Sequence, residues 1–222
     1  MIARHWLGSN HPAVRRPENI VLARAAGTSA GTSVTRATSS CGLPALGVGG
    51  TVDSVPRSIL ADAFAHHSWA TLRLIDACTV LSSAQLTSPV PGTYGPIVDT
   101  LRHIVGADRS YLALLSGDRV TRVDESDLDL GAMRAVIEEN EPLWQTLVAG
   151  ELDTDEVIVR HRDDGSESHA PLGIRLAQVV HHGTDHRSQI CTAMTNLGVE
   201  PPGIDVWDFA DAHGRLREVV PQ

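Results

Sequence analysis

The 222-residue chain is 42% hydrophobic and carries a net charge of −9, so it can bury a core, and its acidic balance disfavours nucleic acid and anionic lipid as partners. All 18 basic residues are arginine, which excludes a Walker A loop, a pyridoxal phosphate or Schiff-base enzyme and a protein kinase, because each needs a lysine. No apolar run is long enough to span a membrane, and three dispersed cysteines favour a reducing, cytoplasmic setting over a disulfide framework.

The first part of the chain differs in composition from the rest. Residues 1–50 carry five arginines against the single acid Glu18, a net charge of +4 that leaves −13 for residues 51–222. Small and hydroxyl residues gather there without a helical or alternating period, so burial cannot repay the entropy of ordering them. We therefore expect residues 1–54 to be a disordered extension and residues 55–222 to form one domain. The extension is similar in composition to a transit peptide, but a start codon assigned too far upstream is the favoured explanation.

Four long segments of the domain have apolar residues that recur near the helical period. They run from about residue 56 to 83, from Pro96 to Gly117, from about Leu130 to Leu147, and from Pro171 to Gly198. Pro142 should bend or split the third helix. Four helices of comparable length predict an all-α four-helix bundle.

Two smaller elements flank the fourth helix. Before it, the apolar run 157–159 and the Asp164-Gly165 dipeptide indicate a short hairpin or an irregular ordered loop. After it, residues 206–216 predict a short helix that packs on the bundle through Trp207 and Phe209.

The fourth helix carries the most informative residues, His182 and His186, which lie four positions apart on its apolar stripe. On a helix such residues stand one above the other, and a third histidine, His103, lies in the second helix. Three neutral imidazoles with an open fourth position are typical of a catalytic metal site. The alternative is that these histidines only hydrogen-bond to backbone or to each other. Spacing alone favours this alternative, because a chain with 11 histidines produces such pairs by chance.

Other hydrolytic motifs are missing from the sequence. Gly183 stands where a zincin would need glutamate, and no paired cysteines support a zinc deaminase. No Gly-x-Ser-x-Gly elbow is present for a serine hydrolase.

Three separated segments match, in order, the pattern of a known family. The segments are 64–70 with Arg73-Leu74, 92–95 followed by 100–108, and 182–189 with Leu197-Gly198. Over about residues 56–210 the chain resembles the DinB-like (DinB/YfiT) four-helix-bundle proteins. The resemblance implies a metal bound by His103, His182 and His186. At position 185 this chain has Asp185 where many members carry another histidine.

The resemblance also implies an activity. The family is similar to thiol S-transferases that use bacillithiol or mycothiol, with Zn, Ni or Fe as the divalent ion that suits imidazole ligands. Alanine-rich usage without lysine is typical of high-GC actinobacteria, where mycothiol is the expected co-substrate. The substrate is then a small electrophile. Metal-assisted hydrolysis and a non-catalytic metal- or ligand-binding stress protein are the alternatives, and a homodimer is left open.

Four further polar residues are candidates for the surroundings of the metal or its pocket. Asp185 either pairs with His181, four positions earlier, or supports a ligand, and the sequence does not separate the two. Gln189 either orients His186 or points to solvent, and solvent is favoured. Asp108 cannot share the face of His103, but it could hold an arginine or a ligand histidine of a neighbouring helix. Ordinary histidine pKa values near 6.5 predict metal loss between about pH 6 and 5.

Overall fold

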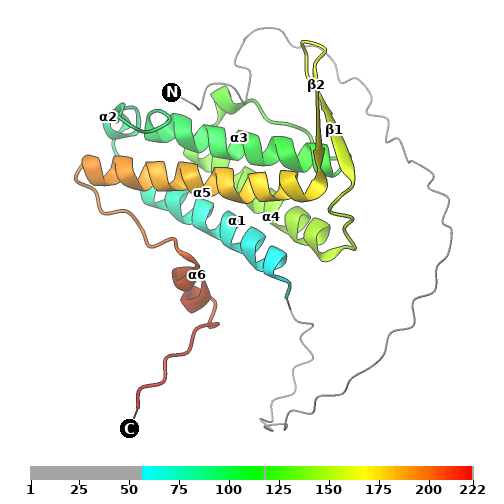
Figure 1. The fold of residues 1–222 in the computed structure, drawn as a ribbon. Helices are drawn as coiled ribbons and strands as arrows, with labels where there is room; N and C mark the ends of the chain where they lie inside the picture. The colour runs from blue at the N-terminus through cyan, green and yellow to red at the C-terminus, as the bar shows by residue number, and fades with distance from the viewer. Residues whose placement is uncertain (1–56, 118, 222) are drawn as a thin grey trace, which may run out of the picture. The chain divides into compact units, whose positions relative to one another are not determined.

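The computed structural model describes residues 57–117 and 119–221, so the expectations for residues 1–54 lie outside it. Its long helices are α1 (Ile59–Cys78), α3 (Ile97–Leu115), α4 (Leu130–Ala149) and α5 (Leu172–Asn196), which pack as a bundle (Figure 1). The predicted four-helix bundle is confirmed. No helix of the described residues combines the length and the apolarity that crossing a membrane requires.

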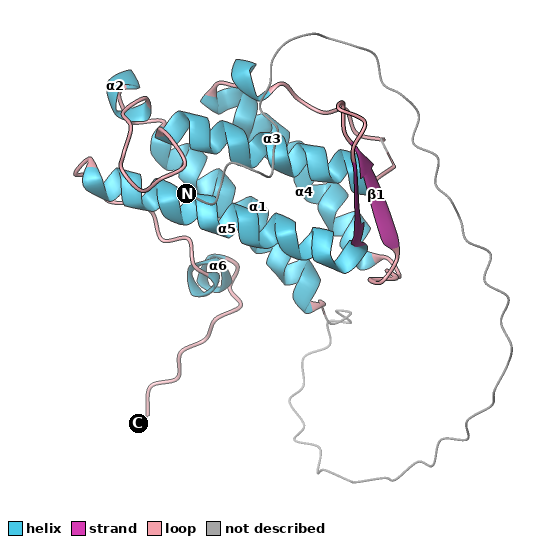
Figure 2. Cartoon of the chain, turned by 45° about the horizontal axis from the view of Figure 1, so that its top comes forward, coloured by secondary structure: helices cyan, strands magenta, loops and turns pink. Residues whose placement is uncertain are grey.

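The helices are connected in an order that differs from a simple up-and-down bundle. One apolar cluster joins the C-terminal halves of α1 and α5 to the N-terminal halves of α3 and α4. Helices α1 and α5 therefore run in one direction, and α3 and α4 run in the other. The segment 119–129, which includes η2 (Glu125–Asp127), returns along α3 (Figure 2). There Arg102 Nε donates to the Leu128 carbonyl at 2.9 Å.

The first helix is shorter than its apolar pattern predicts. It begins after Ser58, whose hydroxyl accepts from the Ala61 amide at 3.0 Å, and it ends at Cys78 rather than at residue 83. A separate helix, α2 (Ser83–Leu86), follows, because Ser82 and Gln85 form a capping box that starts a new turn.

Helix α4 continues through Pro142 and is not split there, contrary to one of the predicted outcomes. A proline removes the amide that would bond to the carbonyl four residues earlier, here that of Glu138. Both residues are exposed, so water can satisfy that carbonyl.

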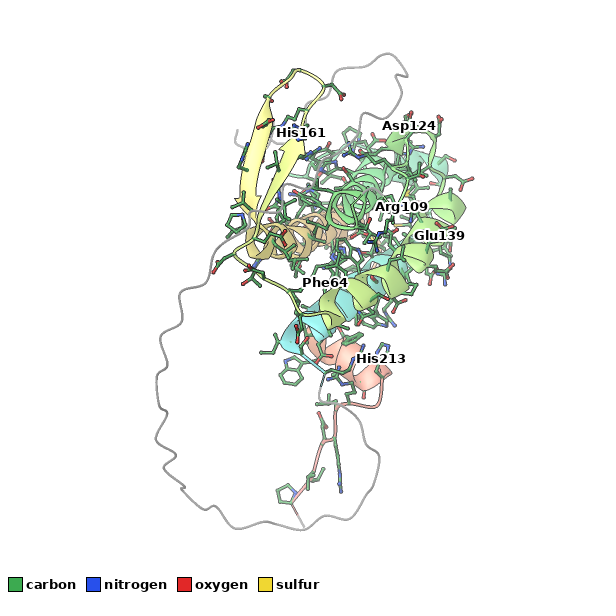
Figure 3. All side chains as sticks on the ribbon, turned by 90° about the vertical axis from the view of Figure 1, so that its right-hand side faces the viewer. Phe64, Arg109, Asp124, Glu139, His161 and His213 are labelled. Atoms are coloured by element: carbon green, nitrogen blue, oxygen red, sulfur yellow. The ribbon has the colours of Figure 1, made fainter. Side chains whose placement is uncertain are left out.

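The segment before α5 is a hairpin, as one of the two alternatives predicted. Strands β1 (Val157–His161) and β2 (Glu167–Pro171) pair antiparallel, with Val157 opposite Pro171. Gly165 supplies the positive φ, +80°, that the turn requires. Figure 3 views the bundle from the hairpin end and shows His161 on the hairpin and Arg109 and Glu139 facing each other between α3 and α4, 3.3 Å apart.

The C-terminal helix α6 (Val206–Ala212) is present, but only one of its two predicted anchors is buried. Phe209 is 3% exposed and packs edge-on against Trp69 of α1. Trp207 is 69% exposed, so this part of the prediction is wrong. Two residues along a helix rotate the side chain by about 200°, which turns Trp207 away when Phe209 faces inward.

Polar side chains occupy the middle of the bundle, between two apolar clusters. One cluster, which includes Leu74, Leu101 and Met133, fills the end where α3 begins. The other, which includes Phe64 and Trp144, fills the end under the hairpin. Between them lie the buried polar residues His67, Thr71, His103, Asp108, Asn140, His186 and Arg187. This middle layer contains the candidate site.

Candidate metal centre

His103 of α3 and His182 and His186 of α5, here called the histidine trio, converge where the two helices face each other. Each histidine offers one ring nitrogen, and these three atoms lie within 4.8 Å of one another. The Nε2 atoms of His182 and His103 are 3.0 Å apart. His103 and His186 are 6% and 7% exposed, so the cluster is almost closed to solvent. The residues that the sequence proposes as ligands are thus brought together.

The outer nitrogen of His186 is fixed by a hydrogen bond. Gln189 Oε1 lies 3.1 Å from His186 Nδ1 and also accepts from the Tyr94 amide at 2.9 Å. Because the backbone amide can only donate, this side-chain atom is the oxygen, and His186 Nδ1 must carry the proton. The Nε2 of His186 therefore has a free lone pair. Gln189 orients the histidine, contrary to the favoured expectation that it points to solvent.

Two residues that the sequence did not suggest surround His103. The ring of Tyr94 stacks on the His103 ring, with centroids 4.4 Å apart and planes at 11°. A carboxylate oxygen of Glu125 lies 3.7 Å from His103 Nδ1, too far for a hydrogen bond but close enough to favour a proton on that nitrogen. Gly106 makes room for it, because a Cβ there would lie 2.1 Å from Glu125 Cγ.

Burial favours the neutral form of His182 and His186. Desolvation, with the nearby rings of His186 and His103, lowers the pKa of His182 to about 3. Desolvation also lowers the pKa of His186, although the bond to Gln189 acts in the opposite direction. Neutral imidazole is the form that binds a metal.

The spacing of the nitrogens suits one divalent ion. Bonds of about 2.0–2.1 Å at tetrahedral or octahedral angles place two nitrogens roughly 2.8–3.4 Å apart. The 3.0 Å separation of His182 and His103 falls in this range. These two nitrogens can also form a hydrogen bond with one proton between them, which is the alternative to metal binding that the sequence leaves open. That hydrogen bond leaves the lone pair of His186 Nε2 unused. The donor set therefore fits a metal.

Asp108 belongs to a separate buried cluster and does not contact the histidine trio. Its carboxylate accepts from His67 Nε2 at 3.1 Å, Trp144 Nε1 at 3.0 Å and Asn140 Nδ2 at 2.7 Å. The Nδ1 of His67 accepts from Arg187 at 3.1 Å. We call Arg187, His67, Asp108, Asn140 and Trp144 the Asp108 network. Burial lowers the pKa of the Arg187 guanidinium to about 10, and the Asp108 charge offsets only part of this effect.

His181 and Asp185 lie outside the site. Both are exposed, and among the ion pairs of residues 57–117 and 119–221 there is none between them. Asp185 therefore neither pairs with His181 nor contacts a ligand histidine directly. Its charge does raise the pKa of His186 through space. A helix turns by about 100° per residue, and here the residues that precede the two inward histidines, His181 and Asp185, face outward.

The comparisons with known proteins agree with this architecture. The sequence pattern of the DinB family matches residues 56–218. The chain belongs to the DinB family. A search among curated protein sequences found no match.

The chain is also similar, at low identity, to two solved structures, and the first of them shows the same fold. A DinB-like protein from Bacillus cereus is 16% identical, with a TM-score of 0.51 over 66% of this chain and 95% of that one. YfiT from Bacillus subtilis, described as a probable metal-dependent hydrolase with an unusual four-helix bundle topology, is 19% identical, with a TM-score of 0.48 over 68% and 94% of the two chains.

Proposed function

We propose that this DinB-family protein is a metal-dependent enzyme that transfers a low-molecular-weight thiol, of the mycothiol type, to a small electrophile. The observation that carries the proposal is the convergence of the histidine trio, with its nitrogens within 4.8 Å of one another. The Nδ1 atoms of His186 and His103 face Gln189 and Glu125, which leaves the Nε2 atom of each ring available as a metal ligand.

The residues of the site would each have a definite task. His103, His182 and His186 would hold Zn, Ni or Fe and leave one position open. Bound there, the ion would supply Lewis acidity that lowers the pKa of a thiol or a water toward neutrality. Three neutral ligands add no negative charge, so the site favours an anionic partner such as a thiolate. Tyr94, stacked on His103, covers one side of the site and keeps it dry.

The reaction would join the thiol sulfur to the electrophilic carbon. The S–H proton passes to solvent, the sulfur lone pair forms the new S–C bond, and the leaving group departs with the electrons of the bond that breaks. Water in place of the thiol would give hydrolysis by the same site, and a bound ion without turnover would give a binding protein.

A thiol-dependence assay tests the proposal. Metal-loaded protein is incubated with alkyl halides, epoxides and esters, with and without mycothiol or cysteine, and products are identified by mass spectrometry. We expect thioethers from the halides and epoxides, and thioesters from the esters, that need both the thiol and the protein. Turnover without a thiol would replace transfer by hydrolysis, and no turnover at full metal occupancy would leave only binding. His186→Ala should abolish turnover, while His181→Ala, a change at an exposed histidine of the same helix, should not.

A further inference from the structure

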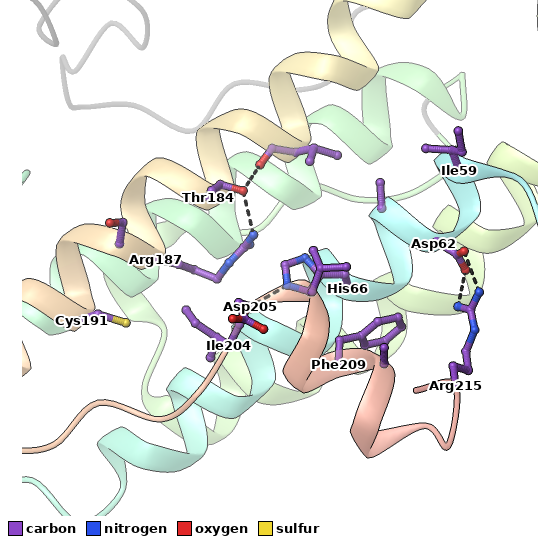
Figure 4. A pocket seen from close by; sticks show the side chains of 15 residues that line it. Ile59, Asp62, His66, Thr184, Arg187, Cys191, Ile204, Asp205, Phe209 and Arg215 are labelled. Carbon is purple, nitrogen blue, oxygen red and sulfur yellow. Dashed lines mark hydrogen bonds and ion pairs between the residues drawn. The ribbon is translucent and has the colours of Figure 1, made fainter. Parts of the chain in front are cut away.

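A cavity of about 720 Å³ lies between α1, α5 and α6, and none of the histidine trio lines it. Figure 4 shows its walls: Phe209 of α6, His66 of α1, and Arg187 and Cys191 of α5. Much of the remaining lining is apolar and includes Ile204. We call this space the α6 cavity. Its volume is in the range that holds a small organic ligand, roughly 300–1,000 Å³.

Arg187 brings a buried positive charge to this cavity. Its side chain is only 2% exposed, and no carboxylate of the described residues lies within ion-pair distance of it. Its Nη1 donates to His67 and Thr71, and its Nη2 donates to Thr184 at 3.2 Å. A desolvated guanidinium without a paired anion is costly, so an anion beside it would be strongly favoured.

The Nε of Arg187 is free to donate into the cavity. No acceptor among the described residues bonds to this Nε. Every fully buried side-chain nitrogen or oxygen of the described residues does have a hydrogen-bond partner, so Nε is not fully buried. Nε must therefore be accessible, and the cavity that Arg187 lines is the space it can reach. The edge formed by Nε and Nη2 is the part of a guanidinium that matches the two oxygens of a carboxylate.

The other charged groups of the cavity are already engaged. Arg215 donates to both carboxylate oxygens of Asp62, at 2.6 and 2.8 Å. Asp205 caps α6 and accepts from the Asp208 amide at 2.8 Å. His66 donates through Nε2 to the Ile204 carbonyl at 2.8 Å. Arg187 is thus the one charged group lining the cavity, within the described part of the chain, that has a free donor and no charged partner.

We propose that the α6 cavity binds a small monocarboxylate with an apolar body, such as a medium-chain acid. The carboxylate accepts hydrogen bonds from Arg187 Nε and Nη2, and the apolar body lies against Ile204 and Phe209. Such a ligand supplies the missing anion and also covers apolar surface that the fold leaves uncovered. This site is separate from the histidine trio and does not depend on the proposed activity.

Octanoate and its neutral isostere octanamide are the probes, and binding is measured by calorimetry on the full chain. We expect octanoate to bind about 10- to 100-fold more tightly than octanamide, because only octanoate forms a charge-assisted pair with Arg187. Equal binding of the two probes would overturn the role of Arg187, and no binding of either would overturn the site.

The reactivity of the Cys191 thiol shows whether octanoate binds in the α6 cavity. It lines the cavity, whereas Cys78 is fully buried, so a Cys41→Ser background leaves Cys191 as the accessible thiol. We expect saturating octanoate to slow the reaction of Cys191 with a thiol reagent at least about fivefold, at a concentration that matches the calorimetric Kd. His186→Ala should keep this protection. Binding without protection, or loss of protection in His186→Ala, would place the carboxylate at the histidine trio instead.

Three variants separate the charge from the fold. Arg187→Gln should remove the preference for octanoate over octanamide, whereas Arg215→Gln, which loses an arginine already paired with Asp62, should change it less than about twofold. If Arg187→Gln does not fold, Ala63→Trp decides, because it fills part of the cavity and leaves Arg187 itself unchanged. Ala63→Trp should lose both probes, and unchanged binding in this variant would overturn the proposal. Binding that disappears when the protein self-associates would assign the cavity to a second copy of the chain.

Discussion

Helix α5 has a polar cluster on each of two faces, and the two clusters are completed in different ways. In the Asp108 network the carboxylate accepts three hydrogen bonds, and both nitrogens of His67 have partners within the protein. In the histidine trio the outer nitrogen of His186 is tied to Gln189, while its inner nitrogen faces two other rings. Around Asp108 and His67 the network is closed and therefore serves the fold, whereas the trio is open toward a ligand.

The largest effect expected from this comparison concerns Asp108. Asp108→Ala removes the acceptor of three buried donors and leaves the charge of Arg187 without its nearest compensation, so we expect unfolding to become easier by about 3–5 kcal/mol. Urea denaturation of the metal-free protein, followed by circular dichroism, measures this. Asp185→Ala, at an exposed aspartate of α5, should change stability by less than about 0.5 kcal/mol. A similar small change in Asp108→Ala would show that the hydrogen bonds of Asp108 do not support the fold.

The next largest effect is on metal content. His186→Ala should lose stoichiometric metal at pH 7.5 and stay helical, because the apolar clusters at the two ends of the bundle do not depend on the ion. Elemental analysis and circular dichroism measure the two properties. His181→Ala is the matched control and should keep the metal. Stoichiometric metal in His186→Ala would remove His186 from the proposed ligands.

A smaller effect on metal binding is expected from Gln189, which contacts a proposed ligand but not the metal position itself. Gln189→Ala frees the outer nitrogen of His186, and loss of such a partner weakens metal affinity by about 10- to 100-fold. Competition with a chromophoric chelator measures the affinity. Gln178→Ala, at an exposed glutamine on the same helix, should leave it unchanged. An unchanged affinity in Gln189→Ala would mean that packing alone fixes the ring.

Acid should release the metal at a lower pH than it would from a site of exposed histidines. Ordinary histidines would lose metal between about pH 6 and 5, as the sequence suggests. Because burial lowers the pKa of His182 to about 3 and also lowers that of His186, protons compete less well, and we expect half-release below pH 5. Metal content after equilibrium dialysis at stepwise lower pH checks this. Release centred above pH 6 would show that the rings are solvated.

The smallest effect is the pH dependence of the metal-free protein. Between about pH 6.5 and pH 3 the unfolded chain binds a proton at His182 that the folded protein does not, so stability falls as the pH falls through this window. The slope is at most about 1.4 kcal/mol per pH unit for this group. Urea denaturation at pH 7, 6 and 5 measures it, and His182→Phe should flatten the slope. A variant with an unchanged slope would assign the dependence to other groups.

The sequence predicts the parts of this molecule that depend on local periodicity. The apolar stripe of α5 places His182 and His186 on one face, and the resemblance of 100–108 to the family pattern adds His103. Tyr94 lies in an irregular segment and Glu125 in the single short turn η2, where no period indicates which way a side chain points. The sequence favours a solvent-facing Gln189 for a related reason, because the second partner of this side chain, the Tyr94 amide, is far away in the sequence.

The Asp108 network could not be derived in the same way. Its members come from four helices, and the direction in which α4 runs depends on the segment 119–129, which returns along α3. At Pro142 the local backbone rule by itself is misleading. It predicts a bend or a break, but α4 continues through the proline because the carbonyl that loses its hydrogen bond lies on an exposed face of the helix.

The contact between Gly183 and His67 makes α5 a useful scaffold for changing the metal preference. A Cβ at Gly183 would lie 2.4 Å from His67 Cε1, so the helix is held against α1 at a position between the two histidines of the trio. The backbone that carries those ligands is thus positioned by packing that no ion supplies. Ligand exchange at 182 or 186, with cysteine for softer ions or aspartate for harder ones, can therefore be attempted without redesigning the bundle.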